Sequence, residues 1–379
     1  PTPTHPAPHF LSRYYSETKL GTAVEDLDTP ALLLDLEAFE RNVAQMAAFF
    51  ADKPAVLRPH SKSHKCPQIA VRQLAAGAIG ITCAKLGEAE VMAEAGVQDI
   101  LVANQVTGRV KIERLTELAR SCDLMVAVDD AENVRQLSGA AEAKAVTVRV
   151  LVEIDIGMGR CGVEPGVPAL DLARQVAAAP GLQLEGLMGY EGHLVMMADP
   201  DERAAKVREA FKPLAETVNL LRQSGLPVRI VSGGGTGTYS TTGTLPFVTE
   251  VQCGSYVFMD TTYRAIRSDF EPTLTVLTTV VSRPVPERIV VDAGMKAMTS
   301  EFGWPRPLAD NGVEVRYLSE EHGVLDLTSP ERVGFRPGDK IRFLPSHCCT
   351  TINLHDVLHV VQDGQLVAMW PIAARGRGQ

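Results

Sequence analysis

Short apolar runs alternate with longer amphipathic stretches from Asp28 to about residue 265. Eight runs of β-branched or aliphatic residues predict strands at 31–36, 55–58, 79–84, 99–104, 123–128, 148–155, 184–190 and 229–233. The segments between them repeat apolar residues at helical spacing, as in Val207, Phe211, Leu214 and Val218. Strands separated by crossover helices predict an α/β fold, a parallel (β/α)8 TIM barrel, with a doubly wound sheet as the alternative.

A different pattern begins after about residue 265. Strand-like runs at 273–282, 288–294, 339–345 and 356–372 are separated by turn residues and lack a helical period. The length of 379 residues suits a barrel of about 250 residues with a smaller domain attached. We therefore assign residues 26–264 to the barrel, and residues 1–25 and 265–379 to an all-β domain that begins with an irregular arm.

Composition narrows the possible partners. The net charge is −9, and the acidic and basic residues are interspersed, which disfavours nucleic acid and anionic membranes and favours a small-molecule substrate. No apolar run reaches the roughly 18 residues of a membrane span, and the opening segment lacks the apolar core of a signal peptide. Seven cysteines, an odd number in a large chain, indicate a reducing cytoplasm.

Two lysines and two histidines follow the second predicted strand, in the segment LRPHSKSHK (57–65). In a barrel, the residues after a strand lie on the catalytic face. A lysine near other cations has a lowered pKa and becomes an amine nucleophile toward an aldehyde. The same residues are also compatible with a solvated basic loop.

A glycine-rich run, SGGGTGTY (232–239), follows the last predicted barrel strand. Glycines there allow successive backbone N–H groups to converge on an anion. The run fits neither the P-loop nor the dinucleotide fingerprint, so it predicts a site for a smaller phosphate. A glycine-rich turn without a ligand is the alternative.

Charged and polar residues also follow two further strands. They are Glu153, Asp155, Arg160, Tyr190, Glu191 and His193. On one barrel rim these side chains combine acid, base and positive charge. For Glu153 and Asp155, ion pairs with a neighbouring strand explain the residues equally well.

The segment PSHCCTTINLHD (345–356) contains a candidate metal pair. In a strand, residues two apart share a face, so His347 and Cys349 converge while Cys348 points away. An imidazole and a thiolate suit a divalent metal such as Zn²⁺, and two ligands leave positions open for water or substrate. A buried cysteine beside a core histidine is the alternative.

Together these segments resemble the fold-type III pyridoxal 5'-phosphate (PLP) enzymes related to alanine racemase, within them the D-threonine aldolase and D-serine dehydratase group. The resemblance covers nearly the whole chain. It is carried by DTPALLLDL (28–36), RPHSKSHK (58–65), EIDIGMGRCGV (153–163), SGGGTGTY (232–239), QCGSYVFMD (252–260), VVDAGMKA (290–297), EEHG (320–323) and HCCTTINLHD (347–356).

The resemblance implies roles for individual residues. Lys62 is expected to form the Schiff base with PLP, and His347 with Cys349 to hold a divalent metal, Zn²⁺ or Mn²⁺, at the barrel rim. The remaining cofactor-binding residues are expected to be His60, Arg160, Tyr190, Gly234, Gly235, Thr236, Gly254, Ser255 and Tyr256. Lys62, Tyr190, Glu191 and His193 are the candidate catalytic residues. A homodimer is also implied.

The activity implied is a metal-dependent lyase acting on D-β-hydroxy-α-amino acids. Retro-aldol cleavage to glycine and an aldehyde is the favoured reaction, and dehydration to ammonia and a 2-oxo acid is the alternative. Two departures bear on this choice. The aldolases usually carry H-x-D where this chain has His347-x-Cys349, as the dehydratases do, and they tend to carry His or Gln at the position of Glu191.

Two other hypotheses remain on the same fold. In an amino-acid racemase the metal pair would have no purpose. A non-catalytic PLP-binding protein would be a single barrel, which does not account for the added β domain.

Overall fold

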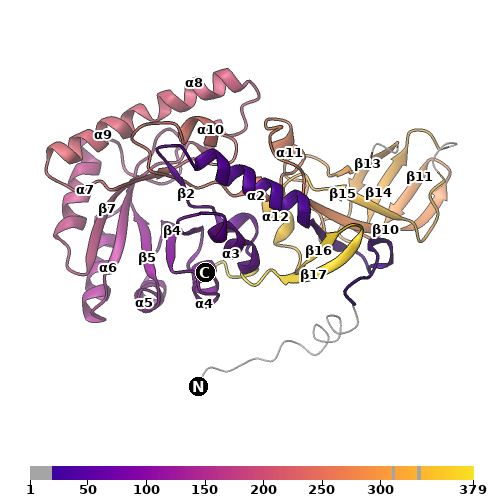
Figure 1. Ribbon diagram of the computed structural model, residues 1–379, viewed down its shortest axis with the longest axis horizontal. Coiled ribbons are helices and arrows are strands. Elements are labelled where there is room, and N and C mark those ends of the chain that lie inside the picture. The colour runs from indigo at the N-terminus through magenta and orange to yellow at the C-terminus, as the bar shows by residue number, and fades with distance from the viewer. Residues whose placement is uncertain (1–18, 310–311, 331–333) are drawn as a thin grey trace. The chain divides into compact units, whose positions relative to one another are not determined.

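The computed structural model describes residues 19–309, 312–330 and 334–379. It contains two compact units, shown in Figure 1. One comprises residues 1–40 and 271–371, and the other residues 41–270 and 372–379. No helix in the described part of the chain is long and apolar enough to cross a membrane.

Eight parallel strands form the barrel of the second unit. They are β2 (Val56–Leu57), β3 (Ile81–Cys83), β4 (Asp99–Gln105), β5 (Asp123–Val128), β6 (Val148–Glu153), β7 (Leu182–Met188), β8 (Ile230–Gly233) and β9 (Glu250–Val251). Their order is β2-β9-β8-β7-β6-β5-β4-β3. The sheet closes because Ile79 N donates to Leu57 O at 3.0 Å and Thr82 N to Pro59 O at 2.8 Å. The predicted barrel is confirmed.

Helices connect these strands and cover the outside of the sheet (Figure 1). They are α3 (Pro67–Ala75), α4 (Leu86–Glu94), α5 (Arg109–Leu118), α6 (Ala131–Ala143), α7 (Val167–Ala178), α8 (Pro200–Ala210), α9 (Lys212–Gln223) and α10 (Tyr239–Thr242), while α11 (Thr261–Arg264) follows the last barrel strand. In α9, Leu214, Val218 and Leu221 are buried at helical spacing, as the pattern predicts. Short 3-10 turns, η2 (Ser61–Ser63), η3 (Gly192–Leu194) and η4 (Ser255–Val257), follow β2, β7 and β9.

One predicted barrel strand belongs to the other unit. Residues 31–36 form β1 (Ala31–Asp35), which pairs antiparallel with β10 and parallel with β16. The eighth barrel strand is instead β9, a pair of residues that the sequence analysis missed. The error has a physical reason: β1 is buried at its first four residues, so its apolar run looks like a barrel strand, whereas β9 is too short to show a pattern.

The first unit is built on a mostly antiparallel sheet. Its strands are β1, β10 (Leu274–Val285), β11 (Arg288–Val291), β12 (Arg306–Pro307), β13 (Val313–Leu318), β14 (Gly323–Leu327), β15 (Lys340–Leu344), β16 (Val357–Gln362) and β17 (Gln365–Pro371). Two short helical segments, η1 (Val24–Asp26) and α12 (Cys348–Ile352), belong to the same unit. The main path runs β13-β14-β11-β10-β1-β16-β17, and β15 pairs with β10 and β12. The C-terminal β domain is therefore confirmed, although β13 and β14 were not predicted.

The limits of the two units differ from the domain boundaries expected from the sequence. Residues 26–40 lie in the first unit because β1 pairs with β10 and β16. Residues 372–379 lie in the barrel unit, where Ala374 N donates to Lys65 O and Gly87 N donates to Gln379 O. The division falls within α2 (Leu36–Phe50). Residues 1–18 of the expected N-terminal arm lie outside the described residues.

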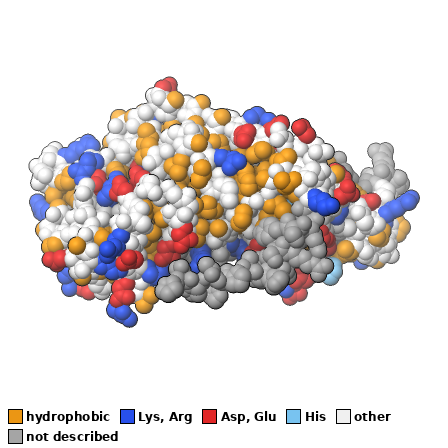
Figure 2. Space-filling view, turned by 60° about the horizontal axis from the view of Figure 1, so that its bottom comes forward, with side chains coloured by type: hydrophobic (Ala, Val, Ile, Leu, Met, Phe, Trp, Pro, Cys, Tyr) orange, Lys and Arg blue, Asp and Glu red, His pale blue; other side chains and the backbone are white. Residues whose placement is uncertain are grey.

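A ring of charges lies at the end of the barrel where β4, β5 and β9 begin. Arg58, 1% exposed, donates from Nε to Glu250 Oε2 at 3.0 Å and from Nη1 to Asp99 Oδ1 at 2.7 Å. Arg149 contacts Asp123, Asp99 and Glu185, and Arg229 contacts Glu185. These pairs link the strands at the end opposite to the predicted site. On the surface drawn in Figure 2, basic and acidic side chains are likewise intermixed.

Candidate active site

The segment after β2 places Lys62 at the carboxyl end of the barrel. His60 N donates to Cys253 O at 3.0 Å, and His60 forms a bridge with Thr82 of β3, so neighbouring strands hold the segment on both sides. The η2 turn then begins, and His60 Nδ1 accepts from Lys62 N at 3.4 Å. Lys62 Nζ lies 5.9 Å from the centre of the Tyr190 ring, which faces it from the end of β7.

The two lysines of this segment have different surroundings. Lys65 Nζ forms an ion pair with the buried Glu88 carboxylate at 2.5 Å. Its backbone adopts a positive φ of 52°, and its carbonyl accepts from Ala374 N at 3.0 Å. Lys62 instead faces an aromatic ring and is half-buried. Lys62 is therefore the lysine of this segment whose amine is placed toward the predicted site.

His60 is a neutral neighbour of Lys62. Burial, with the positive charges of Lys62 and His64, holds the pKa of His60 well below its ordinary value of 6.5. An uncharged imidazole keeps its Nδ1 lone pair available to the Lys62 N–H. His60 thus acts here as the residue that shapes the turn carrying Lys62.

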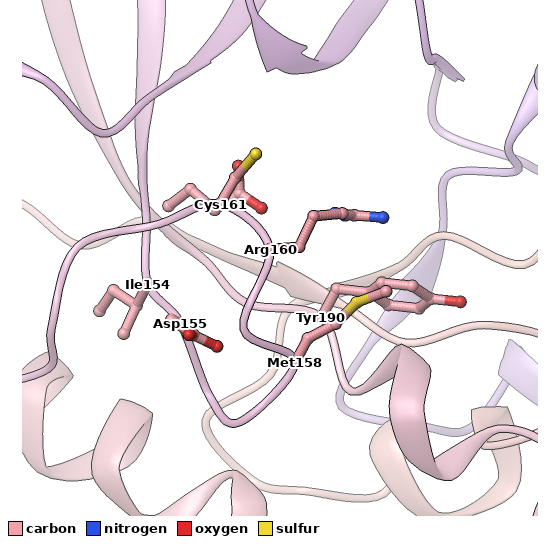
Figure 3. Close-up of a pocket in the computed structure, with 7 residues that line it drawn as sticks. Ile154, Asp155, Met158, Arg160, Cys161 and Tyr190 are labelled. Carbon is pink, nitrogen blue, oxygen red and sulfur yellow. The ribbon is translucent and has the colours of Figure 1, made fainter.

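Arg160 and Tyr190 lie together on the same rim. The Arg160 guanidinium is 5.7 Å from the centre of the Tyr190 ring, and both side chains line a small pocket with Glu153, Ile154, Asp155, Met158 and Cys161. Figure 3 shows Arg160 and Tyr190 extending in the same direction while Cys161 points away from the ring. A guanidinium stacked on an aromatic face keeps its N–H groups at the edge for an anionic or polar partner.

The loop that carries Arg160 is held by Asp155. Its Oδ1 accepts from Gly157 N at 2.9 Å and from Gly159 N at 3.0 Å, and these bonds, with that from Met158, keep its pKa below the ordinary value despite partial desolvation. Glu153 is engaged differently: Gln105 Nε2 donates to its Oε2 at 2.6 Å, and burial raises its pKa. Gln105, which the sequence analysis did not single out, ends β4; its position at a strand end was the signal available.

The glycine-rich turn after β8 presents unpaired backbone donors. Among the described residues, the buried N–H groups of Thr236 and Gly237 have no hydrogen-bond acceptor. Gly234 has a φ of +75°, and a Cβ on Gly235 would lie 3.4 Å from Tyr190 Oη, so the missing side chain leaves space next to that ring. Buried N–H groups without an acceptor fit a phosphate group.

Glu191 contacts this turn through a hydrogen bond that its carboxylate accepts from the backbone of the turn. It is completely buried; its Oε2 accepts from Gly234 N at 3.2 Å and its Oε1 from Thr242 Oγ1 at 2.5 Å. Burial raises the pKa of Glu191, although the bonds from Thr242 and Thr238 oppose the shift. One oxygen is engaged by the turn and the other by α10, which follows it, so the structure places this carboxylate against the turn rather than in open space.

The segment after β9 completes the rim. Gly254 lies against the Lys62 segment, where a Cβ would collide with Ser63 Oγ and approach His60 O to 3.0 Å. Ser255 and Tyr256 begin η4, and Tyr256 N donates to Thr236 Oγ1 at 3.1 Å. The Tyr256 phenol, however, accepts from Gln73 Nε2 of α3 at 2.9 Å, so it is the backbone of Tyr256 that contacts the turn.

His193 is an exposed residue of η3 beyond Tyr190. Its ring lies over Gly157, where a Cβ would be 3.3 Å from Cε1 and Nε2. The charge of His193 also contributes to lowering the pKa of Asp155. The structure therefore brings His193 to the loop that carries Arg160.

His347, Cys348 and Cys349 form a candidate metal site in the first unit. One donor atom from each residue lies within 4.8 Å of the others. The strand expected over 347–349 is wrong: His347 precedes α12 (Cys348–Ile352), and helical backbone brings Cys348 Sγ to 4.0 Å from Cys349 Sγ. Cys348, which a strand would have pointed away, is thus a third candidate donor. An imidazole and two thiols suit a borderline divalent metal.

Comparisons with known proteins cover both units of the chain. The family profile of the alanine racemase N-terminal domain matches residues 34–262, and that of a putative serine dehydratase domain matches residues 273–361. The chain is 42% identical to a D-threonine aldolase of Arthrobacter sp over 360 residues, which cover 94% of this chain and 95% of the relative.

Two solved structures extend the similarity. The D-threonine aldolase from Filomicrobium marinum matches with a TM-score of 0.92 at 43% identity, covering 95% of this chain and 98% of that one. The D-threo-3-hydroxyaspartate dehydratase from Delftia sp. HT23 matches with a TM-score of 0.83 at 30% identity, covering 92% of this chain and 98% of that one.

Proposed function

Because the chain belongs to the PLP-dependent family built on the alanine racemase N-terminal domain, we propose that it is a lyase of the D-threonine aldolase type. Its substrates are D-β-hydroxy-α-amino acids, which it cleaves to glycine and an aldehyde. One observation carries the proposal: Lys62 Nζ faces Tyr190, whose hydroxyl borders the glycine turn with its two buried, unpaired N–H groups. The similarity to a D-threonine aldolase over 94% of the chain supports the choice of reaction.

The residues of the rim fit PLP. Lys62 supplies the amine for the cofactor's aldehyde carbon, the turn at Gly234, Gly235 and Thr236 receives its phosphate, and the backbone at Gly254, Ser255 and Tyr256 borders that turn. His60, Arg160 and Tyr190 surround Lys62. When bound, PLP supplies a ring that accepts the electron pair of a bond broken at the substrate Cα.

His193 is our candidate for proton transfer at the substrate hydroxyl. It is exposed at the rim and close to the Arg160 loop, whereas the two oxygens of Glu191 accept from Gly234 of the glycine turn and from Thr242 of α10. We assign Glu191 to positioning the turn. The variant His193→Ala is expected to lower kcat about 10²-fold or more, the usual contribution of a general base, with PLP affinity unchanged. Unchanged turnover would remove His193 from the mechanism.

His347 and Cys349, with Cys348 as a further donor, fit a divalent metal. The imidazole and thiol set favours Zn²⁺, while Mn²⁺ remains the alternative ion. A divalent ion lowers the pKa of a bound hydroxyl group. The same pair favours a second candidate reaction, dehydration to ammonia and a 2-oxo acid, since the chain carries H-x-C and is 31% identical to a D-threo-3-hydroxyaspartate dehydratase of Delftia sp. (strain HT23).

A parallel product assay tests the reaction. The purified protein is incubated with PLP, Zn²⁺ or Mn²⁺, and D-threonine, and both glycine with acetaldehyde and ammonia with 2-oxobutyrate are measured. Glycine and acetaldehyde are expected from D-threonine and not from L-threonine, and Lys62→Ala should reduce both to background. Formation of 2-oxobutyrate would instead establish the dehydratase. Racemisation of D-alanine that persists after chelation would identify a racemase.

We also propose that the protein is a homodimer in the cytoplasm. Dimers are usual among the enzymes that it resembles. None of the seven cysteines, all within the described residues, forms a disulfide, which fits a reducing compartment. Light scattering coupled to gel filtration tests the assembly: a mass near twice 40.9 kDa is expected, and a monomeric mass would contradict it.

A further inference from the structure

A segment between β11 and β12, residues 297–302, lies against both ends of the stretch that carries the candidate metal donors. Ser346, directly before His347, donates from Oγ to Thr299 O at 2.8 Å. On the other side of Cys349, Thr351 Oγ1 lies 3.1 Å from Thr299 Oγ1. All of these residues belong to the first unit. Thr299 therefore contacts the chain before the first donor and after the last one.

The threonine hydroxyls after the donors form a chain of hydrogen bonds with one direction. Thr350 Oγ1 donates to the Glu301 carboxylate, and a hydroxyl has a single proton to donate. Thr350 Oγ1 must then accept in its 2.9 Å contact with Thr299 Oγ1, and Thr299 in turn accepts from Thr351 Oγ1. Hydrogen bonds that follow one another in this way strengthen each other. Because Thr299 is the central member, its loss breaks the chain on both sides.

The ring of Phe302 contacts the imidazole of His347. The two ring centres are 5.1 Å apart, and the ring planes meet at 90°. This edge-to-face arrangement is a favourable geometry for two aromatic rings. Rotation of the imidazole away from its present direction would lose the contact, so Phe302 favours one direction of the His347 ring nitrogens.

The start of the segment is fixed to other parts of the first unit. Lys296 N donates to Glu320 O at 3.0 Å, and Gly294 passes so close that a Cβ there would lie 2.5 Å from that oxygen. His355 Nε2 donates to Ala297 O at 2.8 Å, so the chain beyond α12 returns to the same segment. The motifs VVDAGMKA (290–297) and EEHG (320–323) thus meet where residues 297–302 begin.

We propose that Thr299 and Phe302 are positioning residues for the divalent metal. The bonds of Thr299 fix the chain before His347 and after Cys349, and the Phe302 ring directs the imidazole. Donors that are already held in place lose less conformational freedom when a metal binds, so the two residues raise metal affinity. Residues that contact metal ligands in this way usually change metal affinity about 10- to 100-fold. The inference rests on the metal site proposed above.

Thr299→Val tests the hydroxyl chain, because valine keeps the branched shape and removes the hydroxyl. Zn²⁺ dissociation constants are measured by competition with a chelating dye, using enzyme that retains PLP. We expect Thr299→Val to bind Zn²⁺ about 10-fold or more weakly and Thr299→Ser to stay within about threefold of the wild type. Thr328→Val is the matched control and should keep wild-type affinity. It removes an exposed hydroxyl of the same unit, which bonds to Gly312 O at 3.2 Å.

The absorption spectrum of Co²⁺-substituted enzyme tests the role of Phe302. The Co²⁺ bands depend on the number and arrangement of the ligands, which a general loss of stability does not alter. Phe302→Leu keeps an apolar side chain and removes the ring, so it is expected to change these bands and to weaken Zn²⁺ binding about tenfold. Tyr317→Leu, which alters an exposed aromatic residue of β13, is the control and should change neither.

Several outcomes would overturn the proposal. Wild-type affinity in Thr299→Val or in Phe302→Leu would exclude that residue, and an equal loss in Thr328→Val would exclude a specific role of the hydroxyl chain. If Thr299→Val does not fold, Glu301→Ala replaces it, because it removes the exposed acceptor at the end of the chain; unchanged Zn²⁺ affinity there would exclude the chain.

The same measurements separate this inference from the proposed reaction. A wild type that binds no Zn²⁺ would contradict the metal site and this inference together. Failure to cleave D-threonine, with the differences in Zn²⁺ affinity intact, would contradict the proposed reaction alone.

Discussion

Glu191 illustrates at the scale of one residue how position decides a role. The sequence predicts Glu191 to be a catalytic candidate, because an acidic residue directly after a barrel strand lies near the catalytic rim. In the structure its carboxylate is buried and is bonded by Gly234 and Thr242. The residues that engage it are 43 and 51 positions away, so local sequence offers no sign of them.

The variants Glu191→Ala and Glu191→Gln separate the two roles. The alanine variant leaves the Gly234 N–H and the Thr242 hydroxyl without their acceptor, which is expected to cost about 1–3 kcal/mol of stability and to weaken PLP binding. The glutamine variant keeps an acceptor for Gly234 and is expected to retain most activity. Thermal denaturation and PLP titration measure both effects. A Gln variant with normal stability and PLP affinity but about 100-fold lower kcat would identify a proton-transfer group instead.

His60 makes stability depend on pH. Its pKa is held well below 6.5 in the folded protein, while the unfolded chain binds a proton near 6.5. The unfolded state therefore takes up a proton first as the pH falls, and stability is lost below about pH 6.5, by up to about 1.4 kcal/mol per pH unit from this group.

Urea unfolding of the apoprotein between pH 5 and 8 measures this contribution. The His60→Asn variant cannot take up the proton and is expected to show a shallower loss of stability toward acid. His322→Asn, which alters an exposed residue of the first unit, is the matched control and should retain the wild-type slope. Identical slopes in the wild type and His60→Asn would contradict the assignment.

At the scale of elements, the charge ring joins residues near the beginnings of the barrel strands, at the end opposite to the candidate catalytic residues. Arg58 is buried between Glu250 of β9 and Asp99 of β4, and its guanidinium occupies the space that a side chain at Gly80 would need. A buried charge without its partner is costly because it has lost its water. Removing one of these charged residues would leave its buried partner unpaired, so we expect the network to stabilise the closed barrel only when all of its charges are paired.

Arg58→Met should lower the free energy of unfolding by about 3–5 kcal/mol, since Glu250 and Asp99 are left without their buried partner. Arg109→Met, which breaks an exposed pair with Glu113 within α5, is the control and should cost about 0.5 kcal/mol or less. The double variant Arg58→Met with Glu250→Leu is expected to recover part of the loss. Urea denaturation measures all three, and a loss below 1 kcal/mol in Arg58→Met would contradict this account.

The elements also show where sequence patterns are sufficient. Seven of the eight barrel strands and the later strands β10, β11, β15, β16 and β17 were recognised from their apolar runs, whereas β12, β13 and β14 were not. β1 was assigned to the barrel in place of β9. An apolar run shows that a strand is buried, but it does not show which strand it pairs with. The helix at Cys348–Ile352 was missed because five residues are too few to display a helical period.

At the scale of the molecule, the candidate cofactor and metal residues are divided between two units. All of the proposed PLP residues belong to residues 41–270, and His347, Cys348 and Cys349 belong to the other unit. Each group can therefore be removed without altering the residues proposed to hold the other.

Chelation is accordingly expected to abolish turnover while PLP remains bound. Added Zn²⁺ or Mn²⁺ should restore activity. Cys349→Ser should lower metal affinity at least tenfold, measured as metal retained after dialysis, because it removes one soft donor. Cys122→Ser, which alters a half-buried thiol of the barrel unit, serves as the control and should retain the metal. Equal retention by Cys349→Ser and the wild type would exclude Cys349 as a ligand.

The sequence by itself determined the class of fold, the segment that holds the candidate Schiff-base lysine and the glycine turn. Those features depend on periodicity and on backbone conformations that neighbouring residues impose. Only the tertiary structure decided that Lys65 pairs with Glu88 while Lys62 faces Tyr190, that Glu191 lies under the turn, and that Cys348 joins the metal candidates. Apart from Cys348, whose direction depends on a helix too short to predict, these roles are set by contacts between residues far apart in the chain, which a local pattern does not contain.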